Sequence, residues 1–316
     1  MLSLYSGFAL KSLMESITQA KDYKDQVKIA EEGRKNANRS KSMLKINSRV
    51  KKVRRTKLGQ CSIYIYEPEE KISEDLVIFF PGGGFIVGGN STHGSIASNI
   101  SATLGRQVCL IEYALVPESK IKQTIEACVE SILLLLNQSK TVDYTLCGHS
   151  AGGGLACQTV IQLIKENQTL PRCLYLVSPS LQHCFSGDKL EILEKCKTDE
   201  ILGKTYHYLM NNESARKKAV ALLGGDEVPE MLDVEDKILK KFPPIHMTYQ
   251  NDEVLSIAIR QVIRKFRRLD IEVVDNSVDN SFHSFLVFDY LPQTKVYLTQ
   301  LKKAFDQKKQ ANNKDD

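Results

Sequence analysis

The chain of 316 residues contains no tryptophan and no C-x-x-C pair of the kind that zinc ribbons and dithiol redox motifs require. Its apolar runs are too short to span a membrane, and the N-terminus lacks the basic and long apolar regions of a signal peptide. We therefore expect a cytoplasmic protein with no metal and no cofactor. Eight scattered cysteines predict small buried side chains in a reducing compartment: Cys61, Cys109, Cys128, Cys147, Cys157, Cys173, Cys184 and Cys196.

Acidic residues are absent from the segment Arg34–Lys57, which carries eleven lysines and arginines. All 38 acidic residues lie in the rest of the chain, so this segment supplies the positive sign of the net charge of +5. Such a segment is able to contact anionic lipid or nucleic acid. It has no interleaved aromatic residues, and Val50 and Val53 lie among its charges. We therefore favour a solvated helix and a first strand over a membrane-surface contact, and expect no nucleic acid partner.

The length and the hydrophobic content of 42% fit a single domain with one large core. Helical stretches lie between most of the later strand-like runs, which predicts a mostly parallel α/β sheet. Residues 178–243 are too long an interval for a strand-to-helix loop and contain helix-forming segments, so they predict a helical insertion. Helical spacing also marks residues 8–30. The expected strands lie near residues 46–55, 60–67, 75–80, 107–112, 142–147, 172–178, 244–249 and 270–275.

The motif with the most specific chemistry is Gly-His-Ser-Ala-Gly at residues 148–152. It follows a strand-like run and precedes a helical stretch that includes Leu155. A G-x-S-x-G motif in this context is typical of a nucleophile elbow, in which glycines are needed because side chains would collide with nearby backbone. The helix N-terminus also favours developing negative charge. The pattern predicts Ser150 as a catalytic nucleophile.

A second glycine motif, Pro-Gly-Gly-Gly-Phe at residues 81–85, follows an apolar run that predicts a buried strand. Consecutive glycines leave backbone N–H groups accessible to a ligand at close range. Such N–H groups stabilise the oxyanion of a tetrahedral intermediate. We expect Gly83 and Gly84, together with Ala151 just after the nucleophile, to form an oxyanion hole.

These motifs resemble those of the hormone-sensitive-lipase branch of the α/β-hydrolases, which usually read H-G-G-G and G-D-S-A-G-G. A third segment, Glu112–Glu118, resembles the D-Y-R-L-A-P-E signature of the same family. Two residues depart from it, Pro81 in place of histidine and His149 in place of aspartate. The resemblance implies an α/β-hydrolase fold with an eight-stranded sheet in one domain, residues 1–316. It also implies a helical cap from residues 1–45 and 181–240.

The order of α/β-hydrolase triads places an acid and then a histidine after the serine. His283 lies in a polar loop and precedes a small residue and a phenylalanine, as the family's histidine does. Directly after the expected strand 244–249 the chain offers Asp252, our preferred acid, with Glu253 as the alternative. The acid would orient the ring that takes the proton of Ser150.

The combined features predict a serine hydrolase that cleaves small carboxylic esters of short to medium acyl chain through an acyl-enzyme. A lipase or deacetylase acting on lipid or sterol esters is an alternative, for which the basic segment is the only hint. An arylformamidase-like amidase is another, although the tryptophan usual after its glycine motif is absent. A hydrolase-fold receptor without turnover usually lacks a triad member. The sequence indicates no oligomeric state.

Overall fold

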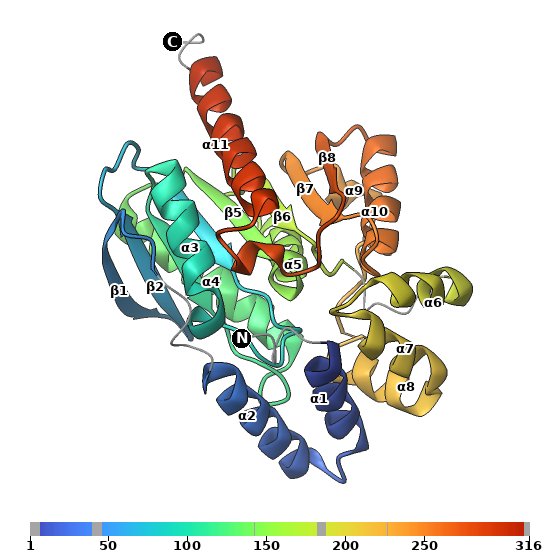
Figure 1. The fold of residues 1–316 in the computed structure, drawn as a ribbon. Coiled ribbons are helices and arrows are strands. Elements are labelled where there is room, and N and C mark those ends of the chain that lie inside the picture. Colours follow the sequence, from blue (N-terminus) through green and yellow to red (C-terminus); the bar gives the residue numbers. More distant parts are fainter. Residues whose placement is uncertain (1–6, 40–45, 142, 182–187, 226, 313–316) are drawn as a thin grey trace.

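The computed structural model describes residues 7–39, 46–141, 143–181, 188–225 and 227–312. Its centre is an eight-stranded sheet in the order β1-β2-β4-β3-β5-β6-β7-β8 (Figure 1). The pairs β1–β2 and β2–β4 are antiparallel, and all other neighbours are parallel. This is the predicted α/β-hydrolase fold. The strands are β1 (Val50–Leu58), β2 (Cys61–Pro68), β3 (Leu76–Phe80), β4 (Val108–Glu112), β5 (Tyr144–His149), β6 (Leu174–Val177), β7 (Ile245–Gln250) and β8 (Val273–Val278).

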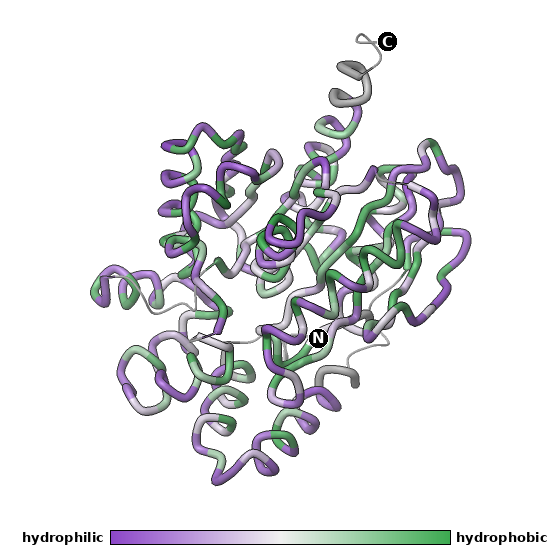
Figure 2. Tube along the Cα trace, turned by 180° about the vertical axis from the view of Figure 1, so that it is seen from behind, coloured by the Kyte–Doolittle hydropathy of each residue, from purple (hydrophilic) through white to green (hydrophobic). Residues whose placement is uncertain are grey.

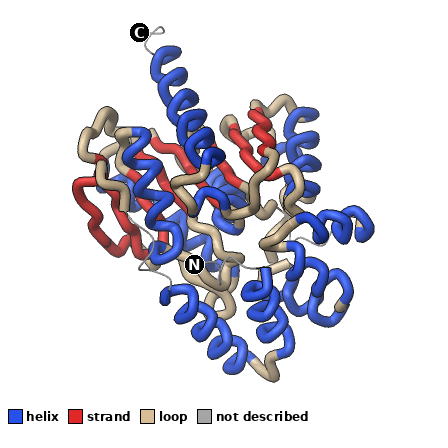
Figure 3. The backbone as a smooth tube through the Cα atoms, viewed as in Figure 1, coloured by secondary structure: helices blue, strands red, loops and turns tan. Residues whose placement is uncertain are grey.

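Helices cover both faces of the sheet, so its central strands are apolar on both sides (Figures 1 and 3). In β3, Val77 and Phe79 pack into the core on one face, while Ile78 and Phe80 pack into the core on the other. The first face is covered by α3 (Asn90–Leu104) and α11 (Pro292–Asn312). The second is covered by α4 (Ile121–Ser139), α5 (Ala151–Lys165), the short α9 (Asp236–Leu239) and α10 (Ser256–Arg268).

Five further helices form a separate group at one end of the molecule (Figure 1). Helix α1 lies against α2, α7 and α8, and α7 also contacts α6. Figure 2 shows hydrophobic residues along the central strands and hydrophilic residues along much of α2. The group is α1 (Gly7–Gln19), α2 (Tyr23–Arg39), α6 (Lys189–Thr198), α7 (Gly203–Asn211) and α8 (Glu213–Leu222).

The insertion is helical, as its helix-forming segments predict, whereas the N-terminal prediction needs a correction. The single helix expected over residues 8–30 is two helices, separated by a turn at residues 20–22. The turn lets α1 lie on α7 and α8 while α2 turns away. Apolar spacing continues across such a break, so it does not reveal one.

The basic segment Arg34–Lys57 is divided between the end of α2 and β1, and residues 40–45 lie outside the described residues. Strand β1 begins at Val50, four residues later than predicted, because Asn47 begins a turn: its side chain accepts from the N–H of Arg49 and its carbonyl oxygen from the N–H of Val50. The strand forms an edge of the sheet, and its lysines and arginines are exposed. Charges on an edge strand oppose pairing with another chain.

Two further findings concern the membrane and the cysteines. No helix in the described part of the chain is long and apolar enough to cross a membrane. Of the cysteines that the structure describes, Cys196 is partly exposed and the other six are buried as free thiols. Cys184 lies outside the described residues.

Candidate active site

Ser150 occupies a sharp turn between β5 and α5. Its backbone has φ 54° and ψ −123°, a conformation that is strained for a residue with a side chain. The flanking glycines are sterically required, as expected. A Cβ at Gly148 would lie 2.6 Å from the carbonyl oxygen of Gly152, and one at Gly152 would lie 2.2 Å from that of Phe80. The local sequence therefore builds the strained turn.

A continuous chain of hydrogen bonds joins Ser150 to a carboxylate. Nε2 of His283 lies 2.8 Å from Oγ of Ser150, and its Nδ1 lies 2.7 Å from Oε2 of Glu253. His283 is 4% exposed and Glu253 is 1% exposed. Burial lowers the pKa of His283, but the hydrogen bond to Glu253 and the negative charge of this residue raise it more, so the net pKa lies above its usual value.

The expectation that Asp252 contacts His283 is wrong, because the neighbouring Glu253 does so. Asp252 points to solvent, with a side chain 55% exposed, and its Oδ1 lies 3.3 Å from Nζ of Lys195. Strand β7 ends at Gln250, and the following turn directs the two adjacent carboxylates to opposite sides. Glu253 begins a buried stretch with Val254. The apolar residues after Glu253 were a signal in its favour.

The turn that carries Glu253 is held by the end of α6. Lys195 donates to the carbonyl oxygen of Asn251 at 2.9 Å, and Thr198 donates to that of Asp252 at 3.1 Å. Buried Asp199 accepts from the N–H of Val254 at 2.9 Å and, through its other oxygen, from the N–H groups of Ile201 and Leu202. We call these contacts the acid-turn clamp. The sequence analysis missed Asp199, whose turn-forming side chain before a helix was the available signal.

The glycine loop after β3 also has a conformation that demands glycine. Gly83 and Gly84 have φ angles of 122° and 62°, and a Cβ at Gly83 would lie 1.8 Å from the carbonyl oxygen of Val87. Two cavities lie beside Ser150, a large one and a small one. Gly84 lines both, Ala151 lines the large cavity and Gly83 lines the small one. The structure thus brings the three residues predicted to form the oxyanion hole to the cavities beside Ser150.

Two buried histidines, His93 and His149, lie next to this loop. The N–H of Gly82 donates to Nε2 of His93 at 3.1 Å, and this nitrogen lies 3.1 Å from Nδ1 of His149. Nε2 of His149 lies 3.2 Å from the carbonyl oxygen of His283. Burial lowers the pKa of His93 to about 3 and that of His149 well below its usual value, so both rings are neutral. The ring of His149 therefore lies between His93 and the backbone of His283, and its single N–H is donated to one of these two neighbours.

The third sequence signature supports the same loop. The hydroxyl of Tyr113 donates to the carbonyl oxygen of Pro81 at 2.7 Å. The guanidinium of Arg34 donates to the carbonyl oxygens of Ile86 and Val116 and pairs with Glu118 at 2.5 Å. Pro81 is thus fixed through its carbonyl group.

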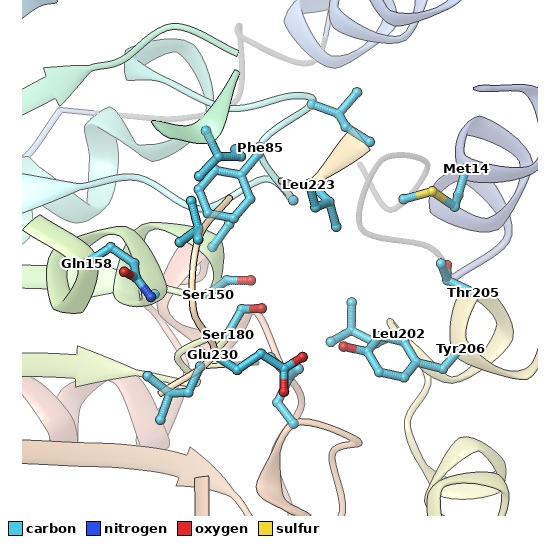
Figure 4. Close-up of a pocket in the computed structure, with 18 of the residues that line it drawn as sticks. Met14, Phe85, Ser150, Gln158, Ser180, Leu202, Thr205, Tyr206, Leu223 and Glu230 are labelled. Atoms are coloured by element: carbon cyan, nitrogen blue, oxygen red, sulfur yellow. The ribbon is translucent and has the colours of Figure 1, made fainter. Parts of the chain in front are cut away.

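Two cavities meet at Ser150, and Leu10 of α1 and Leu202 near α7 line both. The large cavity has about 980 Å³ of empty space, partly open to solvent, and its mostly apolar lining includes Met14 of α1 and Tyr206 and Leu209 of α7 (Figure 4). The small cavity has about 640 Å³ of empty space, also partly open to solvent, and of the two cavities it alone is lined by His283. No group of three or more His, Cys, Asp or Glu side chains in the described ranges is placed to hold a metal ion.

Comparison with known proteins identifies the family of this chain. Residues 77–287 match the model of a family described by its alpha/beta hydrolase fold. The chain belongs to this family. Among solved structures, an esterase from the bacterial hormone-sensitive lipase family covers 93% of this chain and 96% of its own, with a TM-score of 0.75 and 19% identity. An esterase/lipase from an uncultured bacterium covers 88% and 90%, with a TM-score of 0.74 and 20% identity.

Family members with curated names include an esterase of Acinetobacter venetianus, 23% identical over 232 residues, which are 72% of this chain and 73% of that protein. An acetyl-hydrolase of Streptomyces hygroscopicus is 24% identical over 63% of each chain, so the match leaves over a third of that relative uncovered. Human hormone-sensitive lipase is 23% identical over 52% of this chain and 17% of its own length. The predicted resemblance is confirmed, and the chain is an α/β hydrolase of the esterase and lipase type.

Proposed function

We propose that this α/β hydrolase is a serine esterase whose catalytic triad is Ser150, His283 and Glu253. The observation that carries the proposal is the buried chain of hydrogen bonds, 2.8 Å and 2.7 Å long, from the strained serine to a carboxylate. A nucleophile, a base and an orienting acid in hydrogen-bond contact form the arrangement used in acyl transfer. A ligand receptor without turnover has no need of all three.

In the proposed reaction, Oγ of Ser150 attacks the ester carbonyl while Nε2 of His283 takes its proton. Glu253 holds the proton on Nδ1 and stabilises the imidazolium that forms. The N–H groups of Gly83, Gly84 and Ala151 stabilise the oxyanion. His283 then protonates the leaving alcohol, and water, activated by the same base, releases the acid from the acyl-enzyme.

The two cavities give the substrate a direction. The leaving alcohol must face His283, which protonates it, and His283 lines only the small cavity. The acyl group then extends into the large cavity, whose mostly apolar wall suits a short to medium hydrocarbon chain. We infer that α1 and the insertion helices α6–α8 act as a cap, since Leu10 and Leu202 contribute to both cavities.

A p-nitrophenyl ester series from acetate to palmitate tests the proposal. We expect turnover of the shorter esters, and Ser150→Ala should abolish it while the protein stays folded. Labelling by an organophosphate should modify Ser150. Faster turnover of dispersed long-chain esters would favour the lipase alternative, and turnover of the matching anilides alone would favour an amidase. A stable wild-type protein that hydrolyses no member of the series contradicts the proposal.

A further inference from the structure

A carboxylate lies in the wall of the otherwise apolar large cavity. Among the described residues that line this cavity, Glu230 is the only charged one. Figure 4 shows its carboxylate pointing into the open space, with the hydroxyl of Tyr206 turned toward it. Ser150 lines the same cavity. A charge facing a substrate chamber sets which substrate groups that chamber accepts.

The backbone around Glu230 is fixed on both sides. The side chain of Gln158 in α5 donates to the carbonyl oxygen of Pro229 at 2.7 Å, and the N–H of Met231 donates to that of Leu181 at 3.1 Å. The N–H of Asp233 donates to the carbonyl oxygen of Glu230 itself at 2.9 Å. These bonds present the carboxylate from a rigid segment anchored to the hydrolase core.

The wall formed by α7 adds polar and aromatic groups. Thr205 is 4% exposed, and its hydroxyl has no hydrogen-bond partner within the described structure. The aromatic rings of Phe85 and Tyr206 line the same cavity (Figure 4). Aromatic faces attract cations, most strongly where water is excluded.

We propose that the large cavity binds acyl groups that carry a positive charge, with Glu230 as the counter-ion. The substrate class is esters of carboxylic acids that bear an amino or quaternary ammonium group. No lysine or arginine is among the described residues of the wall. In an apolar chamber the attraction between opposite charges is screened less than in water. The inference rests on the proposed function, because it places the acyl group relative to Ser150.

The test compares matched pairs of p-nitrophenyl esters with four, six and eight carbons in the acyl chain. One member of each pair ends in a trimethylammonium group and the other in a tert-butyl group of the same shape. Quaternary ammonium prevents self-cyclisation of the ester. For at least one length we expect kcat/KM to favour the cationic ester by about tenfold or more. Glu230→Gln should bring this ratio close to one.

Glu227→Gln is the matched control. Glu227 lies three residues earlier, pairs with Lys120 at 2.8 Å and does not line the cavity. This variant removes the same charge nearby and should leave the ratio unchanged. If the neutral esters are hydrolysed without a cationic preference, or if the preference survives Glu230→Gln, the inference is overturned and the esterase proposal stands.

Charge on the alcohol provides a further check on direction. Acetylcholine and its neutral isostere 3,3-dimethylbutyl acetate place the cation on the leaving group. A preference for acetylcholine that depends on Glu230 would overturn the assignment of the large cavity to the acyl group. If no ester of either set is hydrolysed, the proposed function fails and the inference fails with it.

Discussion

Replacing Glu253 by glutamine tests which of two neighbouring carboxylates, Asp252 or Glu253, is the acid of the proposed triad. The amide has nearly the same shape, but its NH₂ group can be turned toward Nδ1 of His283, which then accepts instead of donating. Nε2 would then carry the proton and could not take the one on Ser150. Loss of the orienting acid in such triads lowers kcat by about 10³–10⁴-fold, which is about 4–5.5 kcal/mol of transition-state stabilisation.

The control is Asp252→Asn, which removes an exposed charge paired with Lys195. Such pairs contribute about 0–1 kcal/mol, so we expect activity within a few-fold of the wild type. The assay is kcat and KM on a short-chain p-nitrophenyl ester, with circular dichroism to confirm folding. If Asp252→Asn loses as much activity as Glu253→Gln, or more, the assignment of the acid is refuted.

The pH dependence gives an independent measure of the same contact. The reaction needs neutral His283, so kcat/KM should fall as the pH drops through the raised pKa of this residue. Because Glu253 is the cause of the rise, Glu253→Gln should move the acidic limb of its residual activity to lower pH.

The protonated ring paired with Glu253 contributes stability that is fully present below the unfolded pKa of about 6.5 and is lost as pH rises through the folded pKa.

Two further predictions concern the loop and the edge strand. His93→Phe removes the acceptor for the N–H of Gly82, so we expect kcat to fall about tenfold or more with little change in KM, because oxyanion donors act mainly in the transition state. His93→Gln, which keeps an acceptor, should retain more activity; equal activity in all three proteins would contradict a positioning role. Neutralising four basic residues of β1 should leave sedimentation with phosphatidylserine vesicles unchanged. A true lipid site would instead lose about 1 kcal/mol per charge and show salt-sensitive binding in the wild type. The four are Lys51, Lys52, Arg54 and Arg55.

The parts of the site that the sequence predicts are those that depend on local backbone geometry. Gly148, Gly152, Gly82 and Gly83 are dictated by atoms only a few residues away or on the adjacent strand, and Gly84 by its positive φ. The spacing of these glycines in the sequence therefore predicts the two turns. His283 could be proposed because the order of the triad along the chain follows from the fold.

The position of Glu253 and the contact between His93 and His149 depend on segments that are distant in the sequence. Which of two adjacent carboxylates faces His283 depends on the turn after β7, and Lys195 of α6 binds the other one. His93 and His149 meet because α3 and β5 converge below the glycine loop. No spacing in the sequence encodes such contacts, and neither does the break between α1 and α2.

The acid-turn clamp has a consequence for how this enzyme can change. One stretch of the insertion supplies Leu202, Thr205 and Tyr206 to the cavity wall, and it also supplies Lys195 and Asp199 to the turn that carries Glu253. A change in this stretch therefore alters substrate selectivity and reaction rate at the same time. Remodelling this stretch for a new substrate disturbs the acid unless Asp199 keeps its place. Variants that alter the opposite wall, on the segment around Glu230, escape that constraint and offer the easier evolutionary route.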